Sequence, residues 1–114
     1  MAKAEILPPK DHAEKVERLR TVLRTIEKNP QHWDQGYFHS PCGTSHCFAG
    51  FAAMFAIGLK QATNADIQEK SDLSTAEIAE KWLGIEEWSG RNLFYYDNTI
   101  DDLRSIVNEI ADAP

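Results

Sequence analysis

The chain has 114 residues, of which 42% are hydrophobic, and a formal net charge of −6. This length and apolar content suffice for one globular domain that needs no disulfide bond or metal ion to stabilise it. The charge is uneven, because residues 1–60 hold eight Lys/Arg against six Asp/Glu and residues 61–114 hold four against twelve. An acidic half repels phosphate groups, so nucleic acid is excluded as the default partner and a basic protein surface is expected instead.

Residues 1–10 contain Pro8-Pro9 and predict a flexible or extended N-terminal arm, followed by a single α-helical domain over residues 11–114. The N-terminus has no apolar run long enough for a signal peptide. The longest apolar run is roughly 14 residues, shorter than the ~20 that a bilayer span needs. We therefore expect a cytoplasmic protein that does not enter a membrane, with two cysteines that are not a structural disulfide.

The first helix is predicted to begin at Asp11, because Glu14 follows at the spacing of a capping box. It is predicted to end at Asn29-Pro30, because proline cannot continue a helix. Its buried stripe is expected to comprise Val16, Leu19, Leu23 and Ile26.

Residues 31–43 are irregular and aromatic, and glycine and proline interrupt them, which predicts a loop with at most a short strand. Trp33, Tyr37 and Phe38 are expected to fold over the next element as a lid.

That next element, at about residues 45–59, is the apolar helix around which an all-α fold is expected to pack. Its bulky side chains occupy every side of a helical wheel, as in a helix buried all round. Thr44 or Ser45 is the expected N-cap. Gly50 lowers helix propensity by about 1 kcal/mol, and close contact with another backbone would explain its presence.

Capping residues and helix-ending residues predict the remaining elements. Residues 60–72 predict a polar connection with at most one turn of helix. Ser74 and Glu77 form a capping box that opens a helix over Thr75–Leu83, which Gly84 is suited to end. Thr99 is expected to cap a last helix, and the three amphipathic helices are expected to pack on the central one. The buried stripe of the last helix is predicted to be Leu103, Ile106, Val107 and Ile110.

The run Cys42-Gly43-Thr44, Cys47, Ala49-Gly50 and Ala52 resembles the C-G-T-x-x-C-x-A-G-x-A core of a group of small uncharacterised bacterial and bacteriophage proteins. Leu83-Gly84, Leu93-Phe94 and the segment from Thr99 to Ile106 are similar to the rest of that group's outline. The resemblance covers roughly residues 33–110. It implies a helical architecture and a phage or mobile-element setting, without an activity.

Four zinc-competent side chains occur within nine residues: His39, Cys42, His46 and Cys47. Their spacing differs from the usual two-knuckle patterns. On a helix, residues 46 and 47 would point about 100° apart, which hinders joint ligation. We therefore expect no metal or other cofactor, and keep a zinc site at residues 39–47 as the alternative.

The same residues allow two forms of thiol chemistry. A cysteine that opens a central helix is similar to the papain-like arrangement, but no histidine follows position 46 to act as the usual general base. Cys42 and Cys47 could also form a redox pair, although the oxidoreductase spacing is C-x-x-C. The simpler expectation is that Cys47 packs as a small core group and Cys42 shapes a turn.

Residues 75–85 are similar to the first helix and turn of a helix-turn-helix, but the next segment offers only Arg91 to read bases. The leading hypothesis is therefore a small acidic non-enzymatic domain that binds another protein or a second copy of itself. The expected partner-binding residues are Glu86, Glu87, Trp88, Tyr95 and Tyr96.

Overall fold

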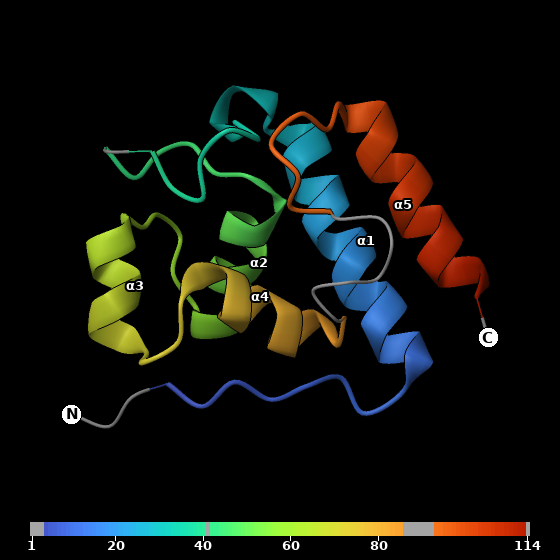
Figure 1. Cartoon of the computed structure of the whole chain (residues 1–114), viewed down its shortest axis with the longest axis horizontal. Coiled ribbons are helices and arrows are strands. Elements are labelled where there is room, and N and C mark those ends of the chain that lie inside the picture. Colours follow the sequence, from blue (N-terminus) through green and yellow to red (C-terminus); the bar gives the residue numbers. More distant parts are fainter. Residues whose placement is uncertain (1–3, 41, 86–92, 114) are drawn as a thin grey trace.

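The computed structural model describes residues 4–40, 42–85 and 93–113. The secondary structure within these ranges is helical, without a strand, which confirms the expected all-α fold (Figure 1). The elements are α1 (His12–Lys28), the 3-10 helix η1 (Pro30–His32), α2 (Phe48–Ile57), α3 (Asn64–Lys70), α4 (Thr75–Leu83) and α5 (Ile100–Asp112). In the described ranges, no helix has the length and apolar character to cross a membrane.

Helix α1 begins and ends where the sequence predicts. The Asp11 carboxylate accepts a hydrogen bond from the Glu14 backbone N–H at 2.8 Å. The Glu14 carboxylate accepts from the Lys10 N–H instead of the Asp11 N–H, so the predicted capping box is only half formed. Most of the predicted stripe is buried, with Val22 in addition, and Val16 is half-buried.

Helix α2 begins at Phe48, so the predicted start near residue 45 and the predicted caps Thr44 and Ser45 were wrong. Ser45 and His46 instead pair with the preceding loop. The Ser45 carbonyl accepts from the Ser40 N–H at 2.7 Å, and the His46 N–H donates to the His32 carbonyl at 2.9 Å. These hydrogen bonds to a distant segment outweigh the local capping preference, and Cys47 becomes the N-cap residue.

The predicted close contact at Gly50 is confirmed. A Cβ atom at this position would collide with the Phe38 carbonyl oxygen, so the loop backbone lies directly on α2. The loop side chains do not form the expected lid, because Tyr37 is 54% exposed and Phe38 is 42% exposed. Only Trp33 of the three aromatics is partly buried against the core.

Helix α3 was not predicted, since residues 60–72 were expected to hold at most one turn. Thr63 and Asp66 form a complete capping box: the Thr63 N–H donates to the Asp66 carboxylate, and the Asp66 N–H donates to Thr63 Oγ1. Ile67 is the one buried residue of this short helix. The cap and a single apolar anchor thus suffice to form it.

Helices α4 and α5 agree with the prediction. Both begin with complete capping boxes, Ser74 with Glu77 and Thr99 with Asp102. Gly84 ends α4 in the left-handed region at φ 68°. On α5, Leu103, Ile106 and Val107 are buried, and Ile110 is half-buried.

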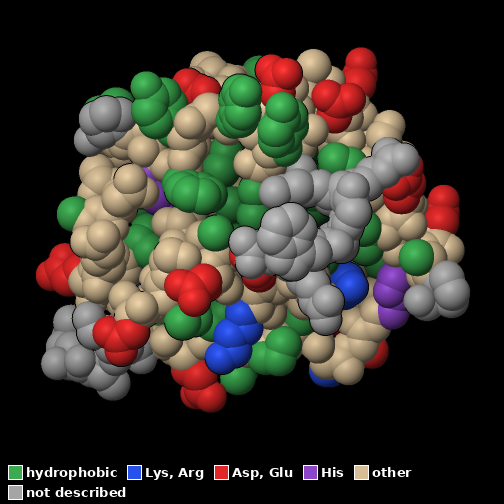
Figure 2. Space-filling view, in the orientation of Figure 1, with side chains coloured by type: hydrophobic (Ala, Val, Ile, Leu, Met, Phe, Trp, Pro, Cys, Tyr) green, Lys and Arg blue, Asp and Glu red, His purple; other side chains and the backbone are tan. Residues whose placement is uncertain are grey.

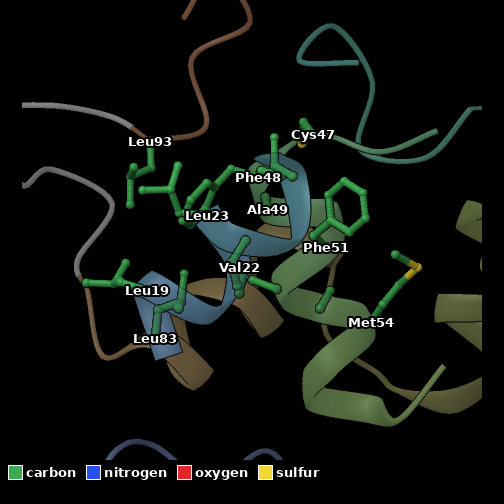
Figure 3. Close-up of a cluster of buried hydrophobic side chains, with 14 of the residues drawn as sticks. Leu19, Val22, Leu23, Cys47, Phe48, Ala49, Phe51, Met54, Leu83 and Leu93 are labelled. Carbon is green, nitrogen blue, oxygen red and sulfur yellow. The ribbon is translucent and has the colours of Figure 1, made fainter. Parts of the chain in front are cut away.

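Amphipathic helices pack around the apolar helix α2 as predicted, except that α5 packs on α1 instead. Helix α2 packs mainly on α4 and also on α1, whereas α5 packs on α1, on the side away from α2 (Figure 1). Helix α1 therefore lies between α2 and α5, and its residues Leu19, Val22 and Leu23 contribute to the core (Figure 3). Arg104 of α5 donates to the Glu27 carboxylate of α1 at 2.7 Å, which also joins these two helices.

Residues 4–10, within the expected N-terminal arm, are extended and pack against the domain. Ile6 is buried at 3% exposure, and the Ala4 N–H donates to the Lys70 carbonyl at 2.8 Å. The Pro9 ring lies so close to Gly84 that a Cβ there would come within 2.6 Å of its Cγ.

Candidate functional site

One buried side chain, Gln35, organises the loop before α2. Its Nε2 donates to the Leu93 carbonyl at 2.8 Å and to the Tyr95 carbonyl at 3.0 Å. Its Oε1 accepts from the Trp33 indole at 2.9 Å and from the Phe48 N–H at 3.2 Å. Gln35 therefore joins the 33–38 loop, the start of α2 and the 93–96 segment, a role that no local sequence signal indicates.

The segments joined by Gln35 enclose a surface groove of about 270 Å³, which we call the aromatic groove. Tyr95 and Tyr96 form one wall, with ring centroids 4.9 Å apart and exposures of 49% and 67%. Exposed Tyr37 and Phe38 line the groove as well. Its described lining is Gln35, Gly36, Tyr37, Phe38, Cys47, Phe94, Tyr95 and Tyr96.

The predicted partner-binding residues divide into two sets. Tyr95 and Tyr96 are exposed at the aromatic groove, while Glu86, Glu87 and Trp88 lie outside the described residues. The pKa of Tyr95 is raised, chiefly by Tyr96 and with a smaller contribution from the Asp97 charge. In Figure 2, hydrophobic side chains gather along the top of the molecule, where the loops of Figure 1 lie, and acidic side chains border them.

Behind the loop, the imidazoles of His39 and His46 contact each other, with their Nδ1 atoms 2.8 Å apart. Both residues are buried, at 3% and 2% exposure. One Nδ1 must donate and the other accept, so at least one of the two rings is neutral. Burial lowers the pKa of each ring to about 4, with an added contribution from the neighbouring histidine: His46 for His39, and His32 for His46.

The neighbours of the pair indicate the direction of its hydrogen bonds. The Gly43 backbone raises the pKa of His46, which is the effect of a carbonyl that faces a ring N–H. We therefore infer that His46 Nδ1 accepts from His39 Nδ1–H, which leaves His39 Nε2 to accept from the Thr75 hydroxyl at 3.3 Å. This series of hydrogen bonds links Thr75, the first residue of α4, to His46, two residues before α2, through two neutral rings.

The two cysteines occupy different environments, and both are free thiols. Cys42 is exposed, and hydrogen bonds from Thr44, 2.9 Å from its sulfur, and Ser40 lower its pKa to about 7. Cys47 is buried at 2% exposure, and burial raises its pKa to about 11. The expected packing of Cys47 in the core is thus confirmed.

The four zinc-competent residues do not converge. His39 and His46 bond to each other, Cys42 lies on the surface, and Cys47 lies among core side chains. No group of three or more His, Cys, Asp or Glu side chains that could hold a metal ion occurs in the described part of the chain.

Comparisons with protein-family models, with curated proteins and with solved structures find no match to this chain. The resemblance to proteins with the C-G-T-x-x-C-x-A-G core therefore stays a prediction.

Proposed function

We propose that the protein is a non-enzymatic binding domain that captures an extended basic segment of another protein in the aromatic groove. The observation that carries this proposal is the clustering of exposed aromatics. Among the described residues, the exposed large hydrophobics are Leu7, Tyr37, Phe38, Phe55, Tyr95 and Tyr96, and four of these six line this one groove.

A cluster of this kind is typical of a recognition surface. Contiguous exposed apolar side chains have a cost in a protein that remains monomeric, and Tyr side chains are enriched among the residues that dominate binding energy. The groove is also held in place before any partner arrives, because Gln35 ties its two walls together through four hydrogen bonds. Such preorganisation reduces the entropy lost on binding.

The charge and size of the groove indicate the partner's chemistry. Asp34 and Asp97 are exposed and adjoin the lining residues Gln35 and Tyr96 in the chain. Carboxylates beside exposed aromatic faces favour Lys or Arg side chains, which pair with the first and stack on the second. A volume of about 270 Å³ accepts a few side chains of an extended segment.

The biological setting is an extension of the same proposal. The resemblance to small bacteriophage proteins suggests a phage or mobile-element accessory factor that acts on a host protein. A second copy of the chain is the other partner to test. Helix α1 presents exposed basic residues such as Arg24 and Lys28, which the acidic side of another copy could meet.

The test is a displayed library of random peptides panned on the wild-type protein, followed by affinity measurements on the enriched peptides. We expect peptides rich in Lys or Arg, with affinity lost about tenfold or more in a Tyr95→Ser/Tyr96→Ser variant. Phe55→Ser is the matched control, because Phe55 is also an exposed aromatic, at 42% against 49% for Tyr95, but lies outside the groove. Enrichment of acidic peptides, or equal binding by both variants, would overturn the proposal.

The alternative, a metal or thiol site at residues 39–47, makes the opposite prediction. Replacing Cys42 by Ser should leave peptide capture unchanged if the groove is the functional surface. A zinc ion in the native mass spectrum that a chelator removes, together with loss of capture in Cys42→Ser, would favour the alternative.

A further inference from the structure

A second cleft lies between the end of α1 and one face of α2, and it has two adjoining compartments. One, of about 210 Å³, is lined by polar residue types apart from Phe51, and the other, of about 220 Å³, is mainly apolar. They share the lining residues Thr25, Phe51 and Lys60, so they adjoin, and we refer to the two together as the amphipathic cleft. Figure 3 shows that Phe51 projects from the side of α2 turned away from Leu19 and Leu83.

The apolar compartment is made by α2 and the residues that follow it. Met54, Phe55 and Leu59 line it together with Phe51. Phe55 is 42% exposed, and its ring stacks on Trp82 at a centroid distance of 6.0 Å. A methionine thioether beside two phenyl rings adapts readily to a flexible alkyl chain.

Lys60 gives the polar compartment one permanent positive charge. Lys60 and His32 line it, and neither an Asp nor a Glu appears among the described lining residues of either compartment, in a chain of net charge −6. His32 is fixed in the wall, because its Nδ1 donates to the Thr44 carbonyl at 2.8 Å. The Asn29 amide donates to the Thr25 carbonyl at 3.0 Å, which fixes a second polar side chain there.

We propose that this amphipathic cleft binds a medium-chain monocarboxylic acid. The alkyl chain lies along Phe51, Met54 and Leu59, and the carboxylate lies at Lys60 and the polar compartment. One permanent cation suits a single negative charge better than a phosphate dianion. Together the compartments reach the lower part of the range of about 300 to 1,000 Å³ that is typical of small-molecule sites.

The test is a titration of ¹⁵N-labelled protein with octanoate, followed by backbone chemical shifts. We expect shifts at Phe51, Leu59 and Lys60, with octanoate binding about threefold tighter than octanol, as one partly exposed ion pair predicts. Acetate, which has the head group alone, should produce no saturable shift.

Two variants separate the carboxylate contact from non-specific binding. Lys60→Gln should reduce octanoate affinity about threefold and leave octanol affinity unchanged, whereas Lys81→Gln, an exposed lysine outside both compartments, should change neither. Equal affinities for octanoate and octanol, or shifts confined to residues outside the cleft, would overturn the proposal. The aromatic groove is a separate site, so neither result bears on the proposal that it binds a peptide.

Discussion

Among single residues, the buried His39–His46 contact has the clearest measurable consequence. The native pKa of each ring is about 4, below the ordinary value of 6.5 that applies in the unfolded chain. Because the unfolded chain binds protons first, the stability from the neutral pair is complete above about pH 6.5 and is lost as the pH falls toward 4. Because the rings share one hydrogen bond and affect each other's protonation, we expect a total loss of about 3 kcal/mol.

The measurement is the free energy of urea unfolding between pH 7.5 and 4.5. The lowered pKa values of the carboxylates of Asp66 and Glu77 act mainly below this window, since they lie below ordinary carboxylate values. A His39→Gln/His46→Gln variant should lose most of the slope, whereas His12→Gln, on the exposed start of α1, should keep it. Identical slopes in all three proteins would show that the pair does not stay neutral in the folded state.

Between elements, Gln35 connects segments that are far apart in the chain. In Gln35→Glu, the carboxylate still accepts from Trp33 and Phe48, but it cannot donate to the Leu93 and Tyr95 carbonyls. We expect a stability loss of about 1 to 2 kcal/mol, because a carboxylate then faces two carbonyl oxygens. Amide hydrogen exchange should accelerate at residues 93–96 more than in α1, and Gln31→Glu, at an exposed position, should change neither quantity. Uniform acceleration throughout the chain would contradict a local role for Gln35.

The helices that the sequence predicts are those with local signals. Helices α1, α4 and α5 have capping residues and one-sided apolar stripes, and each begins where its cap indicates. The start of α2 was misplaced because Ser40 and His32, from the preceding segment, hydrogen-bond to the backbone of residues 45 and 46 and keep them out of the helix. Helix α3 was missed because it is only seven residues long and buries one residue, Ile67, so it has no apolar stripe to predict it.

The candidate site was less predictable than the helices, because it depends on contacts between separate segments of the chain. The sequence places His39 and His46 near each other, but their hydrogen bond depends on the chain reversal between them. Gln35 bonds to carbonyls 58 and 60 residues away, and no periodicity or spacing records such a contact. Tyr95 and Tyr96 were identified as surface residues, whereas their meeting with Tyr37 and Phe38 required the fold.

For the whole molecule, the N-terminal segment links three helices, α1, α3 and α4. It bonds to the end of α3 through the Lys70 carbonyl and packs Pro9 on Gly84 at the end of α4. Arg18 of α1 donates both to the Leu7 carbonyl at 2.8 Å and to the Trp82 carbonyl. The arm therefore closes one side of the domain across three helices.

This closure predicts that two neighbouring residues differ sharply in their effect on stability. Ile6 is 3% exposed and belongs to the core, whereas Leu7 is 59% exposed. Ile6→Ala should lower the free energy of unfolding by about 2 to 4 kcal/mol, as other large-to-small core changes do. Leu7→Ala should change it by no more than about 0.5 kcal/mol. Chemical denaturation of both variants measures the difference, and similar small effects would mean that the arm does not contribute its side chain to the core in solution.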